Sequence, residues 1–131
     1  MKKLLMALAI TAASTQLVYA SDALKAAIAG EQRTPANVTR DAARHPYETL
    51  QFFGVSQKSA LVELAPGGGW YTEILAPYVR KDGKLILAGA GARLKTRLDA
   101  SPATYDKVVY GEFAPGKKID YAPTNSVDVV L

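Results

Sequence analysis

Short apolar runs alternate with segments of helical spacing along the second half of the chain. The apolar runs at residues 60–64, 84–88, 107–110 and 127–131 predict four strands. Between the first three, residues 70–79 and 92–98 predict helices, with Leu94 and Leu98 on one face of the second. Strands that alternate with helices predict right-handed crossovers, so we expect an α/β fold with a parallel sheet of the doubly wound type.

The residues ahead of the first strand predict helices. Residues 21–30 form one that Ser21 caps and Gly30 ends, and residues 34–44 form another, with Pro35 at its first position. A third helix begins at Pro46 and stops at Gly54. Farther on, Ser101-Pro102 begins a predicted loop, and residues 111–125 are expected to be largely irregular. The predicted organisation is a helical segment over residues 21–55 and a sheet domain over residues 56–131.

The last apolar run, residues 127–131, ends the given sequence inside a predicted strand. A parallel strand of a doubly wound sheet is covered on both faces and paired on both sides. An apolar strand left at the edge would invite aggregation. We therefore expect the sequence to be the N-terminal part of a longer protein, or a second chain to complete the sheet.

Residues 1–20 have the pattern of a cleavable secretory signal. Lys2 and Lys3 form a basic start, an apolar stretch follows, and Val18-Tyr19-Ala20 places small residues where a signal peptidase cuts. The apolar stretch is too short to favour a membrane-spanning helix. We expect an exported protein, in the bacterial periplasm, with no stable membrane span after cleavage.

Composition and charge exclude several classes of protein. The chain has 131 residues, of which 49% are hydrophobic and 21% charged, which fits one folded domain. With no cysteine and one histidine, thiolate and multi-histidine metal sites are excluded, and we predict no metal. Loss of Lys2 and Lys3 with the signal lowers the formal charge from +4 to +2. The remaining basic residues are scattered, which disfavours nucleic-acid binding.

The segment from Glu63 to Gly69 carries the candidate chemistry. Glu63 is a carboxylate near the end of a buried strand, where a charge is costly unless something binds it. The glycines at residues 67–69 allow the backbone to approach a ligand closely, and the helix that follows offers free N–H groups. The dinucleotide pattern G-x-G-x-x-G fails, because Thr72 stands at its sixth position. An acid at this place suits the cationic S-adenosylmethionine better than a pyrophosphate.

The run Val62-Glu63-Leu64-Ala65-Pro66-Gly67-Gly68-Gly69 resembles the first motif of class I S-adenosylmethionine-dependent methyltransferases, whose fold is Rossmann-like. Residues 45–50 (HPYETL), 52–55 (FFGV) and 66–78 (PGGGWYTEILAPY) are similar to a group of exported bacterial predicted methyltransferases. The resemblance covers about residues 40–131. It implies methyl transfer from S-adenosylmethionine to an unknown acceptor, by a fragment that is inactive alone and lacks the catalytic residues.

The resemblance also implies a set of cofactor-binding residues. Glu63 would orient water or the amino group of the methionine moiety, and the backbone of Ala65, Pro66, Gly67, Gly68 and Gly69 would lie against the cofactor. Glu112 would accept from the adenine amine and Phe113 would offer its backbone N–H.

Two residues depart from the family pattern, and alternative interpretations of several residues and of the function stay open. Ala65 replaces the first glycine of the motif, and Gly89 stands where many relatives have a ribose-binding acid. Glu63 could be a structural acid, Glu112 a solvated charge, and Tyr71 a packing residue. The alternative functions are a non-catalytic module that binds an adenosine ligand or metabolite, and an NAD-dependent oxidoreductase.

Overall fold

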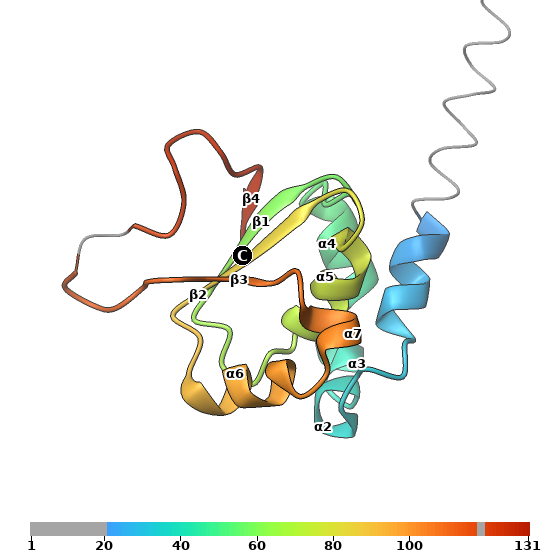
Figure 1. Cartoon of the computed structure of the whole chain (residues 1–131). Helices are drawn as coiled ribbons and strands as arrows, with labels where there is room; N and C mark the ends of the chain where they lie inside the picture. Colours follow the sequence, from blue (N-terminus) through green and yellow to red (C-terminus); the bar gives the residue numbers. More distant parts are fainter. Residues whose placement is uncertain (1–20, 118–119) are drawn as a thin grey trace, which may run out of the picture.

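A computed structural model describes residues 21–117 and 120–131. The signal sequence predicted over residues 1–20 lies outside the described residues. Residues 21–28 are helical, as predicted. The further elements, in chain order, are α2 (Pro35–Val38), α3 (Asp41–Arg44), α4 (Pro46–Phe52), β1 (Ala60–Leu64), α5 (Thr72–Val79), β2 (Lys84–Ala88), α6 (Ala92–Asp99), α7 (Pro102–Tyr105), β3 (Val109–Gly111) and β4 (Val129–Val130) (Figure 1).

The strands form one parallel sheet in the order β3-β2-β1-β4. Val62 of β1 lies beside Ile86 on one side and Val130 on the other. The chain therefore builds the sheet outward from β1 to β3 and then returns to add β4 on the opposite side of β1. This confirms the predicted α/β class and the parallel sheet.

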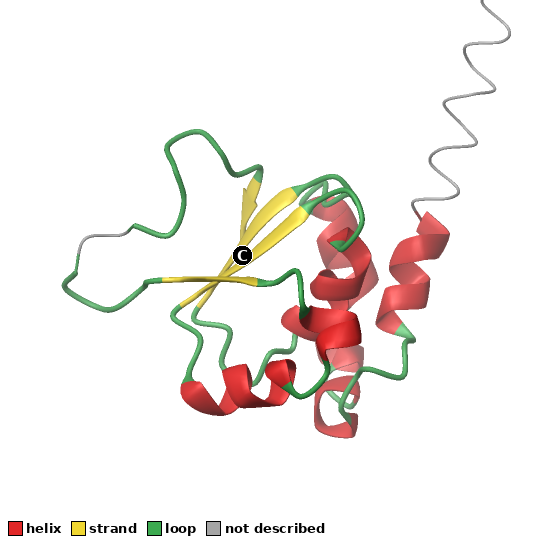
Figure 2. Ribbon diagram, in the orientation of Figure 1, coloured by secondary structure: helices red, strands yellow, loops and turns green. Residues whose placement is uncertain are grey.

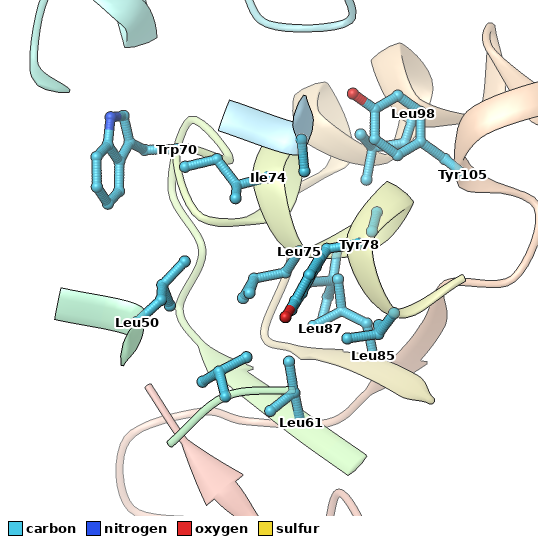
Figure 3. Packing of buried hydrophobic residues seen from close by; sticks show 14 of the residues in the cluster. Leu50, Leu61, Trp70, Ile74, Leu75, Tyr78, Leu85, Leu87, Leu98 and Tyr105 are labelled. Carbon is cyan, nitrogen blue, oxygen red and sulfur yellow. The ribbon is translucent and has the colours of Figure 1, made fainter. Parts of the chain in front are cut away.

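The sheet separates two cores of unequal size. Leu61, Leu85 and Leu87 face α5, α6 and the N-terminal helices, and Figure 3 shows them packed against Ile74 and Leu75. On the other face Val62, Ile86 and Ala88 form a smaller cluster. Its covering residues are Leu64, Phe113, Tyr121, Ala122 and Val127. The alternating burial follows from the two-residue period of a strand.

The covering of the second face differs from the prediction. A doubly wound sheet carries helices on both faces. Here the described part of residues 112–128, which connects β3 to β4, is a loop without a helix (Figure 2). The turns at residues 115–116 and 124–125 and the antiparallel bridge between Glu112 and Asp120 are its local order. The second face is therefore covered by irregular chain, as the expected irregularity of residues 111–125 implies.

Several predicted boundaries were wrong. The helix predicted over residues 34–44 is divided into α2 and α3 at Thr39 and Arg40. The loop predicted to begin at Ser101-Pro102 contains α7, because Pro102 suits a first helical position. The helix predicted from residue 70 begins at Thr72. The last two strands are shorter than predicted, although Leu131 still exchanges hydrogen bonds with Val62 and Leu64.

Candidate functional site

The glycine turn leaves β1 through backbone conformations that favour glycine. The φ angle is +55° at Gly67 and +79° at Gly69, in the left-handed region. Ala65 has φ +48°, although it carries a Cβ. The amide of Ala65 still donates to the carbonyl of Ala88 at the end of β2, at 2.9 Å. The turn therefore starts directly at the carboxyl edge of the sheet.

Gly68 and Gly69 have different surroundings. A Cβ added to Gly69 would lie 2.8 Å from Leu94 Cδ1 and 2.9 Å from Arg97 Nη2, so these side-chain ends would have to shift, and the φ of +79° disfavours any side chain there. A Cβ added to Gly68 would meet no atom within 4 Å. Gly69 therefore allows the close packing of α6, whereas Gly68 leaves open space where a side chain would stand.

A cavity of about 320 Å³ opens above this turn. It is lined by Glu63 and residues 64–68, together with Arg40, Arg44, Tyr71 and Leu131. The cavity lies where β4 follows on the opposite side of β1 from β2, which is the place where open parallel sheets bind ligands. It combines one carboxyl group with two guanidinium groups.

Glu63 shares its face of β1 with Leu61 and points toward the start of α5. Its side chain is 4% exposed, and Thr72 Oγ1 donates to Glu63 Oε2 at 2.6 Å. Burial raises the pKa of the Glu63 carboxyl from 4.5 to about 7, and the hydrogen bond from Thr72 lowers it in part. The group can therefore change its charge near neutral pH, and an approaching cation would favour the ionised form.

Tyr71 and Arg44 are two further polar residues that line the cavity. Burial raises the pKa of the Tyr71 hydroxyl, the Arg44 guanidinium lowers it, and the Glu63 carboxylate raises it. The guanidinium of Arg44 lies 4.8 Å from the ring centroid of Trp70, so the ring holds it by a cation–π contact. The rings of Trp70 and Tyr71 meet edge to face at 4.6 Å. Trp70 thus packs in the core, while Tyr71 lines the cavity.

A buried ion network holds the glycine turn against the N-terminal helices. Glu73 is fully buried and accepts from Arg97 Nη1, from the backbone N–H of Thr34 at 3.0 Å and from Thr34 Oγ1 at 3.1 Å. Arg33 Nε lies 3.7 Å from Glu73 Oε2. Arg97 Nη2 also donates to the carbonyl of Gly68 at 2.7 Å. The network therefore links α6, α5 and residues 33–34 to the turn itself.

The predicted cofactor-binding residues fall into two groups. Glu63, Ala65, Pro66, Gly67 and Gly68 line the cavity, as a shared role requires, and Gly69 lies buried beside them.

Glu112 and Phe113 follow β3 and are not among the residues that line this cavity. Phe113 instead lies against Gly89, where an added Cβ would be 2.8 Å from the Phe113 carbonyl oxygen. Glu112 is exposed. A ligand that touched both groups would have to extend along the carboxyl edge from β1 past β2 to β3.

Sequence reasoning missed Arg40, Arg44 and the network around Glu73. Arg40 and Arg44 are four residues apart in a predicted helix, which already places them on one face. Their proximity to Glu63 required the packing of α3 against the turn. Glu73 pairs with Arg33 and Arg97, which are distant in sequence, and no local pattern indicates such a pairing.

Within residues 21–117 and 120–131 no group of three or more His, Cys, Asp or Glu side chains is placed to hold a metal ion. None of the helices in the same ranges has the length and hydropathy to cross a membrane. Comparisons with protein-family models, curated proteins and solved structures found no match to this chain.

Proposed function

We propose that the protein binds S-adenosylmethionine in the cavity above the Gly67–Gly69 turn and serves methyl transfer to an acceptor. The observation that carries this proposal is Glu63, a carboxyl group that is 4% exposed yet lines a cavity beside a glycine turn. An ionised carboxylate at such a place is costly without a cationic partner. The methyl donor carries a sulfonium and an ammonium group, either of which would supply the positive charge.

The shape of the turn supports the same ligand. Gly68 has open space in place of a side chain, so its backbone can lie against a flat adenosine ligand. The strand order β3-β2-β1-β4 is also the order in which doubly wound, Rossmann-like sheets of the class I methyltransferase type begin. In such a protein Glu63 and the backbone of residues 65–69 would hold the donor, and Glu112 and Phe113 would meet its adenine.

The bound donor supplies an already activated methyl group. The work left to the protein is then to orient the donor and the acceptor, because alignment lowers the barrier of such a transfer. The residues named above hold the donor. A site for the acceptor and a catalytic base are not among them.

A second candidate is an NAD-binding oxidoreductase. The observation that favours it is the pair Arg40 and Arg44, since guanidinium groups suit a pyrophosphate. Glu63 in the same cavity opposes a dianionic ligand. A third candidate, a binding module without catalysis, predicts binding of the donor with no methyl transfer.

Calorimetric titration with S-adenosylmethionine, S-adenosylhomocysteine and NAD tests the proposal. We expect both adenosyl ligands to bind more tightly than NAD. Glu63→Ala should lower the affinity for S-adenosylmethionine by about tenfold or more. Gly68→Val should also weaken it, because the added side chain fills the open space above the turn. The matched control is Glu48→Ala, an exposed acid of α4 that does not line the cavity. Tighter binding of NAD, or equal affinity of the Glu63 and Glu48 variants, would overturn the assignment.

A further inference from the structure

Two arginines approach the cavity from one turn of chain at the start of α3. Arg40 is the residue before this helix and Arg44 is its last, and the amide of Arg44 donates to the carbonyl of Arg40 at 3.1 Å. Residues four apart lie on the same side of a helical turn. Both line the cavity that Glu63 lines from the opposite element, β1.

The position of this turn is fixed by buried contacts. Arg33 donates to both carboxylate oxygens of Asp41, at 3.0 and 2.9 Å, and its own side chain is 1% exposed. Trp70 Nε1 donates to Asp41 Oδ1 at 2.9 Å and to the carbonyl of Asn37 at 3.0 Å. The face of Trp70 then lies under the guanidinium of Arg44. The two arginines are therefore carried by a segment that is already held in place before any ligand binds.

We propose that Arg40 and Arg44 form a carboxylate subsite of this cavity, which binds the amino-acid end of an adenosyl ligand while Glu63 faces the ammonium group of that end. This inference rests on the proposed function and names the part of the ligand that the N-terminal helices recognise. Guanidinium groups bind carboxylates through paired N–H donors, so two of them match one carboxylate well. The opposite charges in the cavity, two basic and one acidic, match the two charges of an α-amino acid.

The test compares two thioethers that share the adenosine part. S-adenosylhomocysteine carries the amino-acid end, and 5′-methylthioadenosine lacks it. We expect the double variant Arg40→Ala/Arg44→Ala to bind S-adenosylhomocysteine about 10- to 100-fold more weakly. Its affinity for 5′-methylthioadenosine should change by less than about twofold. Arg40→Ala alone should show the same selective loss, and it leaves the contact between Arg44 and Trp70 intact.

The control removes the same charge elsewhere. Lys81→Ala/Arg93→Ala replaces two exposed basic residues that do not line the cavity, and both affinities should stay at the wild-type level. Thermal unfolding of each variant reports whether loss of Arg44 disturbs the fold around Trp70, and Arg44→Lys keeps the charge if it does.

Each outcome decides between the subsite and the function on which it rests. Suppose that the wild type binds both thioethers and the arginine variants lower the affinity for both equally, or for neither. The subsite is then wrong while the proposed function stands. If the wild type binds NAD more tightly and the arginines are needed for that, the pair is a pyrophosphate site. If the wild type binds neither thioether, the proposed function fails and the subsite fails with it.

Discussion

Glu63 makes the stability of the protein depend on pH in a direction opposite to that of most carboxylates. Its pKa rises from 4.5 to about 7 on folding, so the folded state holds the proton more firmly than the unfolded state. Stability from this group is complete below about pH 4.5 and is lost as the pH rises through 7. The loss amounts to about 3 kcal/mol at most, at about 1.4 kcal/mol for each pKa unit.

We therefore predict that Glu63→Gln stabilises the protein at pH 8 and changes little near pH 5. Glutamine keeps the shape of the side chain and removes the ionisation that burial opposes. Urea unfolding at about pH 5 and about pH 8 measures the difference in free energy of unfolding. Glu48→Gln, an exposed acid, should leave the pH dependence of the wild type unchanged. If the free energy of unfolding of Glu63→Gln still decreases between these two pH values as in the wild type, Glu63 is not the cause of the decrease.

The same residue shows what sequence alone could give at this scale. Glu63 and the glycines were recognisable because an acid and a bend stand together in the chain. The distinction between Gly68 and Gly69 was not recognisable, since it depends on Leu94 and Arg97 of α6. Ala65 replaces the first glycine of the motif, and its φ of +48° shows that it occupies a conformation in which glycine would be unstrained.

At the scale of elements, Glu73 binds three segments into one support for the turn. It lies in the first turn of α5, and its charged partners are Arg33, before α2, and Arg97 of α6. A buried ion pair from which one member is removed leaves an uncompensated charge. Loss of Glu73 should therefore disrupt the contacts of all three segments together.

We predict that Glu73→Ala lowers the free energy of unfolding by about 3–5 kcal/mol. Denaturant unfolding measures this change. The matched control is Arg80→Ala, which breaks the ion pair with Asp106, whose side chains are 38% and 39% exposed, and should lower the stability by less than about 1 kcal/mol. Similar losses in the two variants would contradict the structural role assigned to the network.

The limits of prediction at this scale have the same cause. The bounds of β1 and β2 were predicted correctly, because their apolar runs are flanked by polar residues and turns. The break between α2 and α3 was not predicted. The amide of Arg40 donates to the carbonyl of Asn37, and the same carbonyl accepts from Trp70 Nε1, which holds Asn37 against the turn. Tertiary contacts decide such a break, and no local pattern contains them.

At the scale of the whole molecule, alternation of strands and helices was enough to predict the parallel sheet. It gave no indication of how the two faces differ. The helices gather on one side of the sheet (Figures 1 and 2), where Leu61 and Leu87 are buried. On the other face, residues of the loop between β3 and β4 pack against Val62 and Ile86. A second cavity, also of about 320 Å³, opens in this loop among residues 121–127. Of these two cavities, the one above the glycine turn is lined by Glu63.

Hydrogen exchange with and without S-adenosylhomocysteine distinguishes these cavities over the entire chain. Without ligand, we predict slow exchange in β1 and β2, which are paired on both sides, and fast exchange in the described part of residues 112–128, where few backbone hydrogen bonds form. Ligand should slow exchange at residues 40–44 and 65–69, and at residues 112–113 if adenine reaches the end of β3. Residues 121–127 serve as the internal control, since a ligand beside Glu63 does not touch them. Slower exchange there, with no change at the glycine turn, would place the ligand on the opposite face and exclude Glu63 from its binding.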